Sequence, residues 1–177
     1  MLEKFLSDKA FLVVGRGGMD LYPDPPGSRT EDAIKFQAEL GGSSANIAVA
    51  LSRFDQSASL LTCVSNDSIG RFVRNQLSNY GVNAELVRTV TGDTRTSLAL
   101  VESRVEDHQS VIYRNNAADF QMDMSQVDSV DLSPFKALVI TGTCLTLQPS
   151  RDASMHILQR AKAAGLITVL DLDYRPY

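Results

Sequence analysis

The amino-acid sequence is poor in cysteine and histidine, the usual ligands of zinc, and it lacks tryptophan. Its 177 residues include no tryptophan, two cysteines and two histidines. Cys63 and Cys144 stand in apolar stretches, LLTCV and ITGTCL, where a thiol behaves as a small hydrophobic group, and they form no C-x-x-C pair. His108 and His156 have no neighbours at ligand spacing. We therefore expect both thiols in the core and no metal site such as zinc in this chain.

Long apolar runs and an excess of basic charge are also absent. No apolar stretch approaches the roughly 20 residues of a membrane-spanning helix, and MLEKFLSDKAFLVV has an acidic residue and too short an apolar stretch for a secretory leader. The 17 lysines and arginines against 21 aspartates and glutamates give a net charge of -4, whereas nucleic acids and membrane surfaces attract clustered basic charge. We expect a cytoplasmic protein that binds a small molecule, with no nucleic acid and no membrane as partner.

A complete dinucleotide-binding turn is the third absence. Residues 13–20, VVGRGGMD, fit the pattern G-x-G-x-x-G at Gly15 and Gly17 but place Asp20 where the third glycine belongs. A carboxylate there repels a pyrophosphate and accepts hydrogen bonds from hydroxyl groups. The prolines of residues 21–32, LYPDPPGSRTED, break the helix that should receive the phosphate. The turn therefore suits a polyol better than a nucleotide, which argues against an NAD enzyme.

Buried strands alternate with amphipathic helices along most of the chain. Short apolar runs predict strands, and apolar residues at helical spacing predict helices between them. The expected strands are 11–15, 58–64, 84–90, 136–143 and 167–171, and the expected helices lie within 41–54, 66–81 and 151–164. Asn66 or Asp67 should cap the second helix and Gly81 should end it. Ser150 should cap the third helix, and Gly165 should end it.

We expect one α/β core with a separate small β layer. Alternating βα units imply a parallel sheet with helices on both faces. Residues 94–103 and 109–116 alternate in polarity around the charged turn 104–108, which predicts an antiparallel hairpin. This hairpin and the proline-bearing segment after Asp20 do not follow the βα pattern and should form the β layer. The face of the first helix that should pack on the sheet consists of Ile47, Ala50, Leu51 and Phe54.

Candidate ligand-binding residues gather where the expected strands end. Ligands of an open parallel sheet bind outside the carboxyl ends of its strands. Three clusters fall at such ends, namely Gly17, Gly18 and Asp20, then Thr141 to Thr143, then Asp171 to Arg175. A fourth lies at the entry of the first helix, where Gly41 and Gly42 permit close approach of a ligand and Asn46 offers a donor and an acceptor. Together these clusters predict a pocket that recognises hydroxyl groups.

Two arginines extend this prediction to an acidic ligand. The guanidinium fork of Arg114 or Arg175 can bind both oxygens of a carboxylate. Each arginine also has a simpler interpretation. Arg114 could be a solvated residue of the hairpin, and Arg175 a surface residue before the turn at Pro176.

These motifs resemble those of the ribokinase-like, PfkB-type sugar kinases. GGSSANIAVALSRF is similar to the N-terminal signature of that family, and SNDSIGRFV to the segment that follows it. GRGGMDLYP, IYRNNAAD, TGTCLTLQPSR and DLDYRPY are typical of members that phosphorylate a sugar acid of inositol catabolism. The resemblance covers essentially all 177 residues. It implies a ribokinase-like parallel sheet with helices on both faces and a small β lid, formed by segments at about 17–40 and 94–118.

The resemblance also implies roles for single residues. Asp20, Gly42 and Asn46 would bind substrate hydroxyls, and Arg114 and Arg175 would face the carboxylate or the transferred phosphate. The remaining members of the implied site are Gly41 at the substrate, with Gly17, Gly18, Thr143 and Asp171 in support. ATP and Mg²⁺ would serve the complete enzyme, and the lid would pair with another subunit's lid in a homodimer.

The family places its catalytic aspartate in a Gly-Ala-Gly-Asp motif well downstream, beside the ATP pocket, and no such motif occurs up to Tyr177. Phosphoryl transfer needs a base and a charged cradle for the phosphate. We therefore expect residues 1–177 to be the N-terminal, sugar-binding part of a kinase domain, without the ATP-binding part and inactive alone. Kinases of 2-keto-3-deoxygluconate or fructose share the scaffold and are alternatives. A non-catalytic sugar-binding or interaction module is an alternative of another class.

Overall fold

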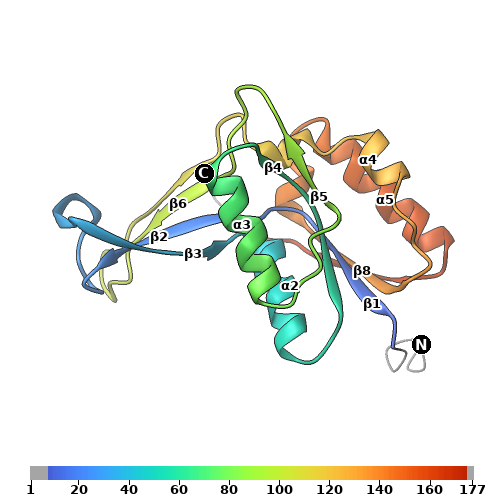
Figure 1. Cartoon of the computed structure of the whole chain (residues 1–177), viewed down its shortest axis with the longest axis horizontal. Coiled ribbons are helices and arrows are strands. Elements are labelled where there is room, and N and C mark those ends of the chain that lie inside the picture. The colour runs from blue at the N-terminus through green and yellow to red at the C-terminus, as the bar shows by residue number, and fades with distance from the viewer. Residues whose placement is uncertain (1–7, 175–177) are drawn as a thin grey trace.

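A computed structural model gives the structure of residues 8–174. Its centre is a five-stranded sheet of order β5-β4-β1-β8-β9, in which all neighbouring strands are parallel (Figure 1). The strands are β1 (Ala10–Val14), β4 (Ala58–Ser65), β5 (Val87–Val90), β8 (Phe135–Thr141) and β9 (Ile167–Asp171). All five expected strands are present. β5 starts late because Glu85 and Leu86 form a turn, and β8 ends early because a 3₁₀ turn, Gly142–Leu145, follows it.

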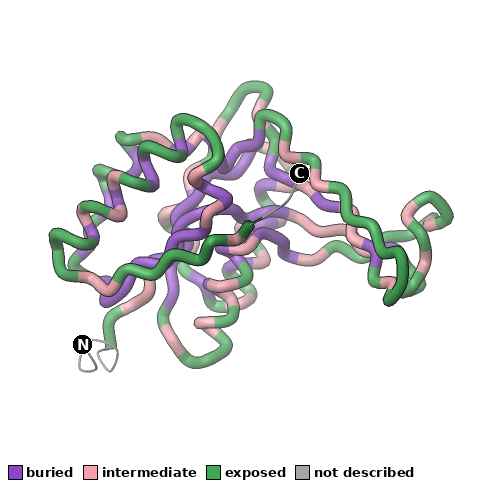
Figure 2. Tube along the Cα trace, turned by 180° about the vertical axis from the view of Figure 1, so that it is seen from behind, coloured by how far each residue is buried: buried purple, intermediate pink, exposed green. Residues whose placement is uncertain are grey.

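Helices cover both faces of this sheet, as expected. The helices are α2 (Ser43–Arg53), α3 (Ser68–Asn79), α4 (Met124–Asp128) and α5 (Ser150–Ala163). Adjacent residues of β1 point into two clusters, Val13 toward α2 and α3 and Leu12 toward α4 and α5. Because the central strands are buried on both sides (Figure 2), they are mainly apolar and do not alternate between apolar and polar residues. Within residues 8–174, no helix combines the length and the apolar character that crossing a bilayer requires.

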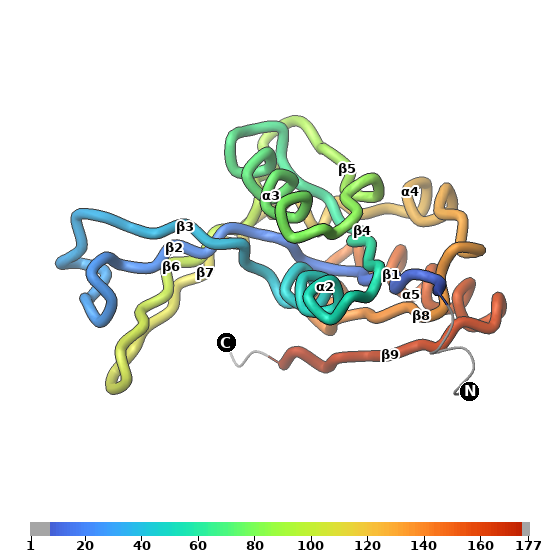
Figure 3. The backbone as a smooth tube through the Cα atoms, turned by 60° about the horizontal axis from the view of Figure 1, so that its bottom comes forward, coloured from blue at the N-terminus to red at the C-terminus, as the bar shows by residue number. Residues whose placement is uncertain are grey.

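A second sheet, which we call the lid, projects from the body of the molecule (Figures 1 and 3). Its strands, in the order β3-β2-β6-β7, are β3 (Lys35–Gly41), β2 (Gly18–Asp24), β6 (Leu98–Val101) and β7 (Ser110–Tyr113). β2 and β3 form one antiparallel hairpin, and β6 and β7 form another. Parallel pairing of β2 with β6 joins the two hairpins. The two segments that did not follow the βα pattern thus form the separate β layer that was expected.

The face by which α2 packs on the sheet differs from the expected one. Of the four residues expected there, Ala50 is exposed, Phe54 is 77% exposed and the other two are only partly buried. The buried residues of α2 are all small: Ser44, Ala45 and Ala48. Small side chains let the helix lie close to the strand ends, and this close contact leaves the largest apolar residue in solvent. The face predicted from apolar spacing was therefore wrong for Ala50 and Phe54, whereas Ile47 and Leu51 do pack against the core beside the small residues.

Three expected helix ends are confirmed. Asp67 caps α3, where its carboxylate accepts hydrogen bonds from the backbone N–H groups of Ile69 at 3.0 Å and Gly70 at 2.9 Å. Gly81 follows α3 with a φ of 73° and Gly165 follows α5 with a φ of 75°. This left-handed conformation is the one that ends a helix most readily at glycine.

The start of α5 differs from the expectation. Pro149 occupies the cap position, and Ser150 lies inside the first turn of the helix. The Ser150 hydroxyl donates to the backbone oxygens of Cys144 at 2.8 Å and Leu147 at 3.0 Å. Ser150 therefore belongs to the helix instead of preceding it, its hydroxyl binds the preceding segment, and the prediction of a serine cap was wrong.

Candidate functional site

A polar cavity lies beyond the carboxyl ends of β1 and β8, beneath the inner face of the lid. Its volume is about 230 Å³, which is small beside the roughly 300–1,000 Å³ of pockets for larger ligands and suits a single sugar-sized molecule. The turn after β1, the start of α2, the lid and the segments after β8 and β9 contribute side chains. The lining residues are Arg16, Asp20, Tyr22, Gly42, Ser43, Asn46, Ala99, Val101, Ser110, Ile112, Arg114, Thr143 and Asp173.

Two glycines shape the entry of α2. Gly42 has a φ of 100°, and an added Cβ there would lie 2.4 Å from the backbone oxygen of Arg16. An added Cβ at Gly41 would lie 2.0 Å from Oδ1 of Asp20. Both positions therefore require glycine, one for backbone conformation and both for space. Their missing side chains let the carboxylate of Asp20 approach the first turn of α2, where Asn46 lies at the edge of the cavity.

Opposite charges meet where the lid leaves the sheet. Nη2 of Arg16 is 3.8 Å from Oδ1 of Asp20, and the two side chains are only 10% and 16% exposed. Asp20 and Tyr22 are two residues apart on β2, so both point to the cavity side of the lid. Partial burial, together with the negative charges of Asp20 and Glu39, raises the pKa of the Tyr22 phenol. Tyr22 therefore stays a neutral hydroxyl that can donate to or accept from a ligand.

Four hydroxyl groups connect α2 to the end of β8 below the cavity. Ser44 Oγ donates to the backbone oxygen of Val14 at 3.1 Å and lies 2.9 Å from Thr141 Oγ1, which is 2.9 Å from Thr143 Oγ1. Ser43 Oγ is 3.4 Å from both threonine hydroxyls. Ser43 and Thr143 also line the cavity. This connected network gives the cavity a polar floor with defined hydrogen-bond directions.

Arg114 follows β7 and reaches from the lid to the body of the protein. Its Nη2 donates to Oδ2 of Asp119 and, at 3.0 Å, to the backbone oxygen of Thr143. Its guanidinium carbon lies 4.2 Å from the centre of the Phe120 ring. The Arg114 side chain is 11% exposed and that of Asp119 is 3% exposed. Arg114 is thus a buried, paired arginine at the cavity wall, and its interpretation as a solvated hairpin residue does not hold.

The structure brings together several of the residues singled out in the sequence. Five of them line the cavity: Asp20, Gly42, Asn46, Arg114 and Thr143. Gly41 stands directly behind the Asp20 carboxylate. Because these residues come from four separate parts of the chain, their meeting supports the expectation that ligand-binding groups gather at the strand ends.

The other predicted residues lie elsewhere. An added Cβ at Gly17 would contact the core residues Val73 and Leu60, and one at Gly18 would lie 2.7 Å from the backbone oxygen of Ser97. These glycines thus serve packing rather than lining. Asp171 is exposed, and its Oδ1 accepts a hydrogen bond at 3.0 Å from the backbone N–H of Asp173. Asp173, rather than Asp171, reaches the cavity. Arg175 lies outside the described residues.

Sequence reasoning missed Arg16 and most of the lid residues. Tyr22 on β2, Val101 on β6, and Ser110 and Ile112 on β7 all line the cavity. Tyr22 lies two residues after Asp20, and Ile112 and Ser110 lie two and four residues before Arg114, which is a signal in the sequence because alternate residues of a strand share a face. On β6 no predicted site residue gave such a starting point, so Ala99 and Val101 could not be found in this way.

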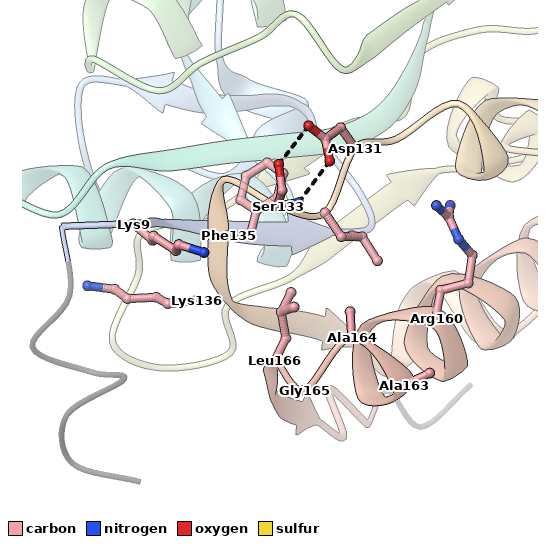
Figure 4. Close-up of a pocket in the computed structure, with 11 residues that line it drawn as sticks. Lys9, Asp131, Ser133, Phe135, Lys136, Arg160, Ala163, Ala164, Gly165 and Leu166 are labelled. Atoms are coloured by element: carbon pink, nitrogen blue, oxygen red, sulfur yellow. Dashed lines mark hydrogen bonds between the residues drawn. The ribbon is translucent and has the colours of Figure 1, made fainter.

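A larger cavity of about 770 Å³ lies at the opposite, amino ends of β8 and β9 (Figure 4). Apolar side chains such as Phe135 and Leu166 form much of its wall. Its polar groups serve the fold: Asp131 accepts hydrogen bonds from the backbone and hydroxyl of Ser133, and Arg160 donates to the backbone oxygen of Val130 at 3.0 Å. The residues singled out in the sequence gather at the lid-covered cavity and not here, so the lid-covered cavity is the better candidate.

Known proteins with similar sequences fall in one family. The pfkB family carbohydrate kinases match residues 9–176. A curated relative from Photobacterium profundum, named 5-dehydro-2-deoxygluconokinase, is 38% identical over 166 residues that cover 94% of this chain and 50% of the relative. A relative of the same name from Clostridium botulinum is 33% identical over 177 residues, covering 98% and 52%. The chain spans about half the length of the curated relatives it matches.

Solved structures share the fold. A fructokinase from Xylella fastidiosa, also solved with bound ATP, has a TM-score of 0.84 at 24% identity, covering 96% of this chain and 52% of that one. A PfkB protein from Polaromonas sp. JS666 has a TM-score of 0.86 at 21% identity, covering 95% and 57%. At these identities the likeness concerns the fold alone. It confirms the expected parallel sheet with helices on both faces and a β lid.

Proposed function

The chain belongs to the pfkB family of carbohydrate kinases, and we propose on that basis that its lid-covered cavity binds the sugar that is phosphorylated. One observation supports this assignment above the others. Asp20 of the lid and Asn46 of α2 line the same sugar-sized cavity, and both offer oxygens that accept hydrogen bonds from hydroxyl groups. A hydroxyl-rich ligand can donate hydrogen bonds to these oxygens, whereas an apolar ligand cannot.

We assign a sugar acid, 5-dehydro-2-deoxygluconate, as the substrate. Relatives that are 38% and 33% identical to this chain carry the name of the kinase for that compound. Arg114 lines the cavity, and a guanidinium matches the geometry of a carboxylate better than any other side chain. In this assignment Asp20, Gly42 and Asn46 surround the hydroxyl groups, while Arg114 and Arg175 face the acid group or the transferred phosphate.

The proposed reaction transfers the γ-phosphoryl group of ATP to the terminal hydroxyl of the sugar acid. The hydroxyl oxygen bonds to phosphorus and gives its proton to a base, while the bond to the bridging oxygen breaks and ADP leaves. Mg²⁺ bound to the nucleotide neutralises charge on the phosphates. The residues of this chain hold and orient the acceptor hydroxyl, and the lid excludes water from it.

The phosphate cradle and the base are assigned outside the described residues. Residues 8–174 contain no group of three histidine, cysteine, aspartate or glutamate side chains placed to hold a metal ion. The sequence also has no glycine-rich loop followed by lysine that could hold a triphosphate. We therefore propose that this chain supplies the acceptor half of the site, and that the length of the relatives beyond it supplies the nucleotide half.

The lid is also proposed to meet the lid of a second subunit. Five apolar side chains of the lid are exposed: Ile34 at 95%, Phe36 at 38%, Val105 at 97%, Val111 at 48% and Tyr113 at 57%. Exposed apolar groups concentrated on one projecting element favour a protein partner. A homodimer through the lids would cover them.

Replacing Asp20 by asparagine tests the assignment of the sugar site. We expect Asp20→Asn to weaken binding of 5-dehydro-2-deoxygluconate by about 10- to 100-fold, because hydrogen bonds to a charged group contribute roughly 1.5–3 kcal/mol. Isothermal titration calorimetry with the 177-residue chain measures the Kd. Asp24→Asn, at an exposed position on the same strand, is the matched control and should leave the Kd unchanged.

The same titration separates the alternatives. Equal affinity for fructose and for the sugar acid would favour a fructokinase, and preference for 2-keto-3-deoxygluconate would favour the kinase of that acid. Coupled release of ADP should stay at background with this chain alone, and clear turnover would show that it carries the nucleotide half after all. Failure to bind any of these sugars would overturn the proposed function.

A further inference from the structure

We propose that Asp119 is a positioning residue that aims the guanidinium of Arg114 at the acid group of the bound sugar. The proposal rests on the proposed function, because it assumes an acidic ligand in the lid-covered cavity. Asp119 does not line that cavity and lies behind Arg114, where its carboxylate accepts from Nη2 of the arginine. It therefore acts on the ligand only through Arg114.

The backbone holds Asp119 firmly in this place. Asn116 has a φ of 48°, a left-handed conformation that reverses the chain direction after β7. Ala117 then forms a parallel bridge with Arg95, and the N–H of Ala118 donates to the Arg95 backbone oxygen at 2.8 Å. Asp119 follows as part of a 3₁₀ turn, Ala118–Gln121, whose first three residues are buried. The carboxylate is thus fixed by the fold, and the long side chain of Arg114 adapts to it.

Burial makes the pair obligatory. The side chains of Asp119 and Arg114 are 3% and 11% exposed, and a carboxylate so removed from water requires a charged or hydrogen-bonding partner. The backbone oxygen of Thr143 and the ring of Phe120 provide two further contacts to the guanidinium. Three contacts from different directions determine one orientation of the arginine.

The orientation leaves donors for a ligand. Both contacts of the guanidinium to oxygen use Nη2. Nε has no hydrogen-bond partner within residues 8–174 either, but it is buried and does not face the cavity, so the donors left for a ligand are those of Nη1. Because Asp119 binds end-on to one nitrogen rather than across the fork, Arg114 keeps hydrogen-bond donors beyond those given to Asp119 and Thr143. An acidic group of the sugar is the chemistry that matches such donors at the cavity wall.

Positioning and simple electrostatics predict opposite results for Asp119→Asn. The amide keeps the size of the side chain but removes a negative charge near the cavity, so an electrostatic role alone would raise affinity for an acid. If orientation matters more, affinity falls, because displacement of a binding group by about 1 Å has large effects. We expect about a tenfold loss of affinity for 5-dehydro-2-deoxygluconate.

The experiment compares two ligands by calorimetry with the 177-residue chain. One is 5-dehydro-2-deoxygluconate, and the other is its analogue with the carboxyl group reduced to an alcohol. Asp119→Asn should weaken only the acid, because Arg114 meets only the acid group, whereas a general loss of structure would weaken both. In an Arg114→Ala background the same change should have no further effect on the acid.

Asp123→Asn is the matched control. It breaks the other close arginine–aspartate pair of this region, Arg88 and Asp123 at 3.0 Å, neither of which lines the cavity. It should lower the melting temperature without changing either Kd. Tighter or unchanged binding of the acid by Asp119→Asn, or equal losses for both ligands, would overturn the positioning role.

A measurement without ligand keeps this test separate from the proposed function. In NMR spectra of the unmodified chain, rotation of the Arg114 guanidinium about the bond to Nη2 should be slow, since two acceptors hold that nitrogen. Fast rotation would overturn the positioning role even if Asp119→Asn fails to fold. An unmodified chain with slow rotation that binds no sugar acid would overturn the proposed function instead.

Discussion

Single residues at the cavity are matched to one another rather than chosen independently. The carboxylate of Asp20 occupies space that any side chain at Gly41 would fill. The backbone oxygen of Arg16 approaches Gly42 in the same way. Asp20 can therefore occupy the position of the third glycine only because Gly41, the last residue of the neighbouring strand β3, has no side chain behind the carboxylate. Glycine is therefore needed at positions 41 and 42, before α2, and not at position 20 of the turn.

Gly42→Ala should be strongly destabilising. An added Cβ would lie 2.4 Å from the Arg16 backbone oxygen, and the φ of 100° is itself unfavourable for alanine. We expect a loss of roughly 2–4 kcal/mol in the free energy of unfolding, measured by urea denaturation. Gly92→Ala is the matched control, because Gly92 has a φ of 92° with nothing within 4 Å of an added Cβ. It should cost only about 1 kcal/mol, and equal losses would refute a steric role for Gly42.

At the scale of elements, one carboxylate joins the two hairpins of the lid. Glu102, whose side chain is 3% exposed, accepts hydrogen bonds from the backbone N–H groups of Thr30 at 2.8 Å and Gln109 at 3.2 Å, and from Nε of Arg104 at 3.0 Å. The N–H of Thr30, followed by Arg104 and Gln109, lowers the pKa of Glu102 from 4.5 to about 2. Thr30 belongs to the β2–β3 connection and Gln109 to the β6–β7 turn, so Glu102 couples both hairpins.

The lid should therefore loosen in acid. Because folding lowers the pKa of Glu102 from 4.5 to about 2, its carboxylate stabilises the lid fully above pH 4.5 and loses this effect as the pH falls toward 2. Hydrogen exchange of the Thr30 and Gln109 amides should accelerate over that range, beyond the intrinsic pH dependence. Glu102→Gln should show fast exchange of both amides at neutral pH already. Glu106→Gln, at an exposed position of the same turn, should behave like the unmodified chain.

At the scale of the whole molecule, the central sheet has one poorly covered edge. β9 is the last strand of the sheet, and four of its five residues are exposed. Val169 is 43% exposed and Leu170 is 49% exposed, and Leu172 just after the strand is 75% exposed. Within residues 8–174 no strand pairs with the outer side of β9. An apolar edge strand with free backbone groups favours pairing with another chain.

We expect this chain to associate through β9 as its concentration rises. Sedimentation velocity should show oligomers for the unmodified chain, and Leu170→Lys should shift the distribution toward monomer, because a charge on an edge strand disfavours pairing. Met155→Lys is the control, since Met155 is 42% exposed but lies on α5, away from a strand edge. A monodisperse unmodified chain, or equal effects of the two lysines, would show that β9 is not the contact.

Much of the architecture was predictable because it depends on short-range patterns. Short apolar runs such as residues 58–64 favour strands buried on both faces, and Asp67 and Gly81 mark helix ends through local backbone chemistry. The packing face of α2 was not predictable in this way. Ser44 and Ala45 are buried because the helix approaches the strand ends closely, and that distance depends on the surrounding packing.

The residues of the site also fall into those that the sequence identifies and those that only the tertiary structure reveals. Asp20, Gly42 and Asn46 could be identified in the sequence because they follow a predicted strand or begin a predicted helix, where ligands of a parallel sheet bind. The choice of Asp173 over Asp171 at the cavity and the pairing of Arg114 with Asp119 depended on where separate segments meet in space. The local sequence pattern determines which secondary structure each segment prefers by itself. Contacts between distant segments depend on the packing of all of them together, which no single stretch of sequence contains.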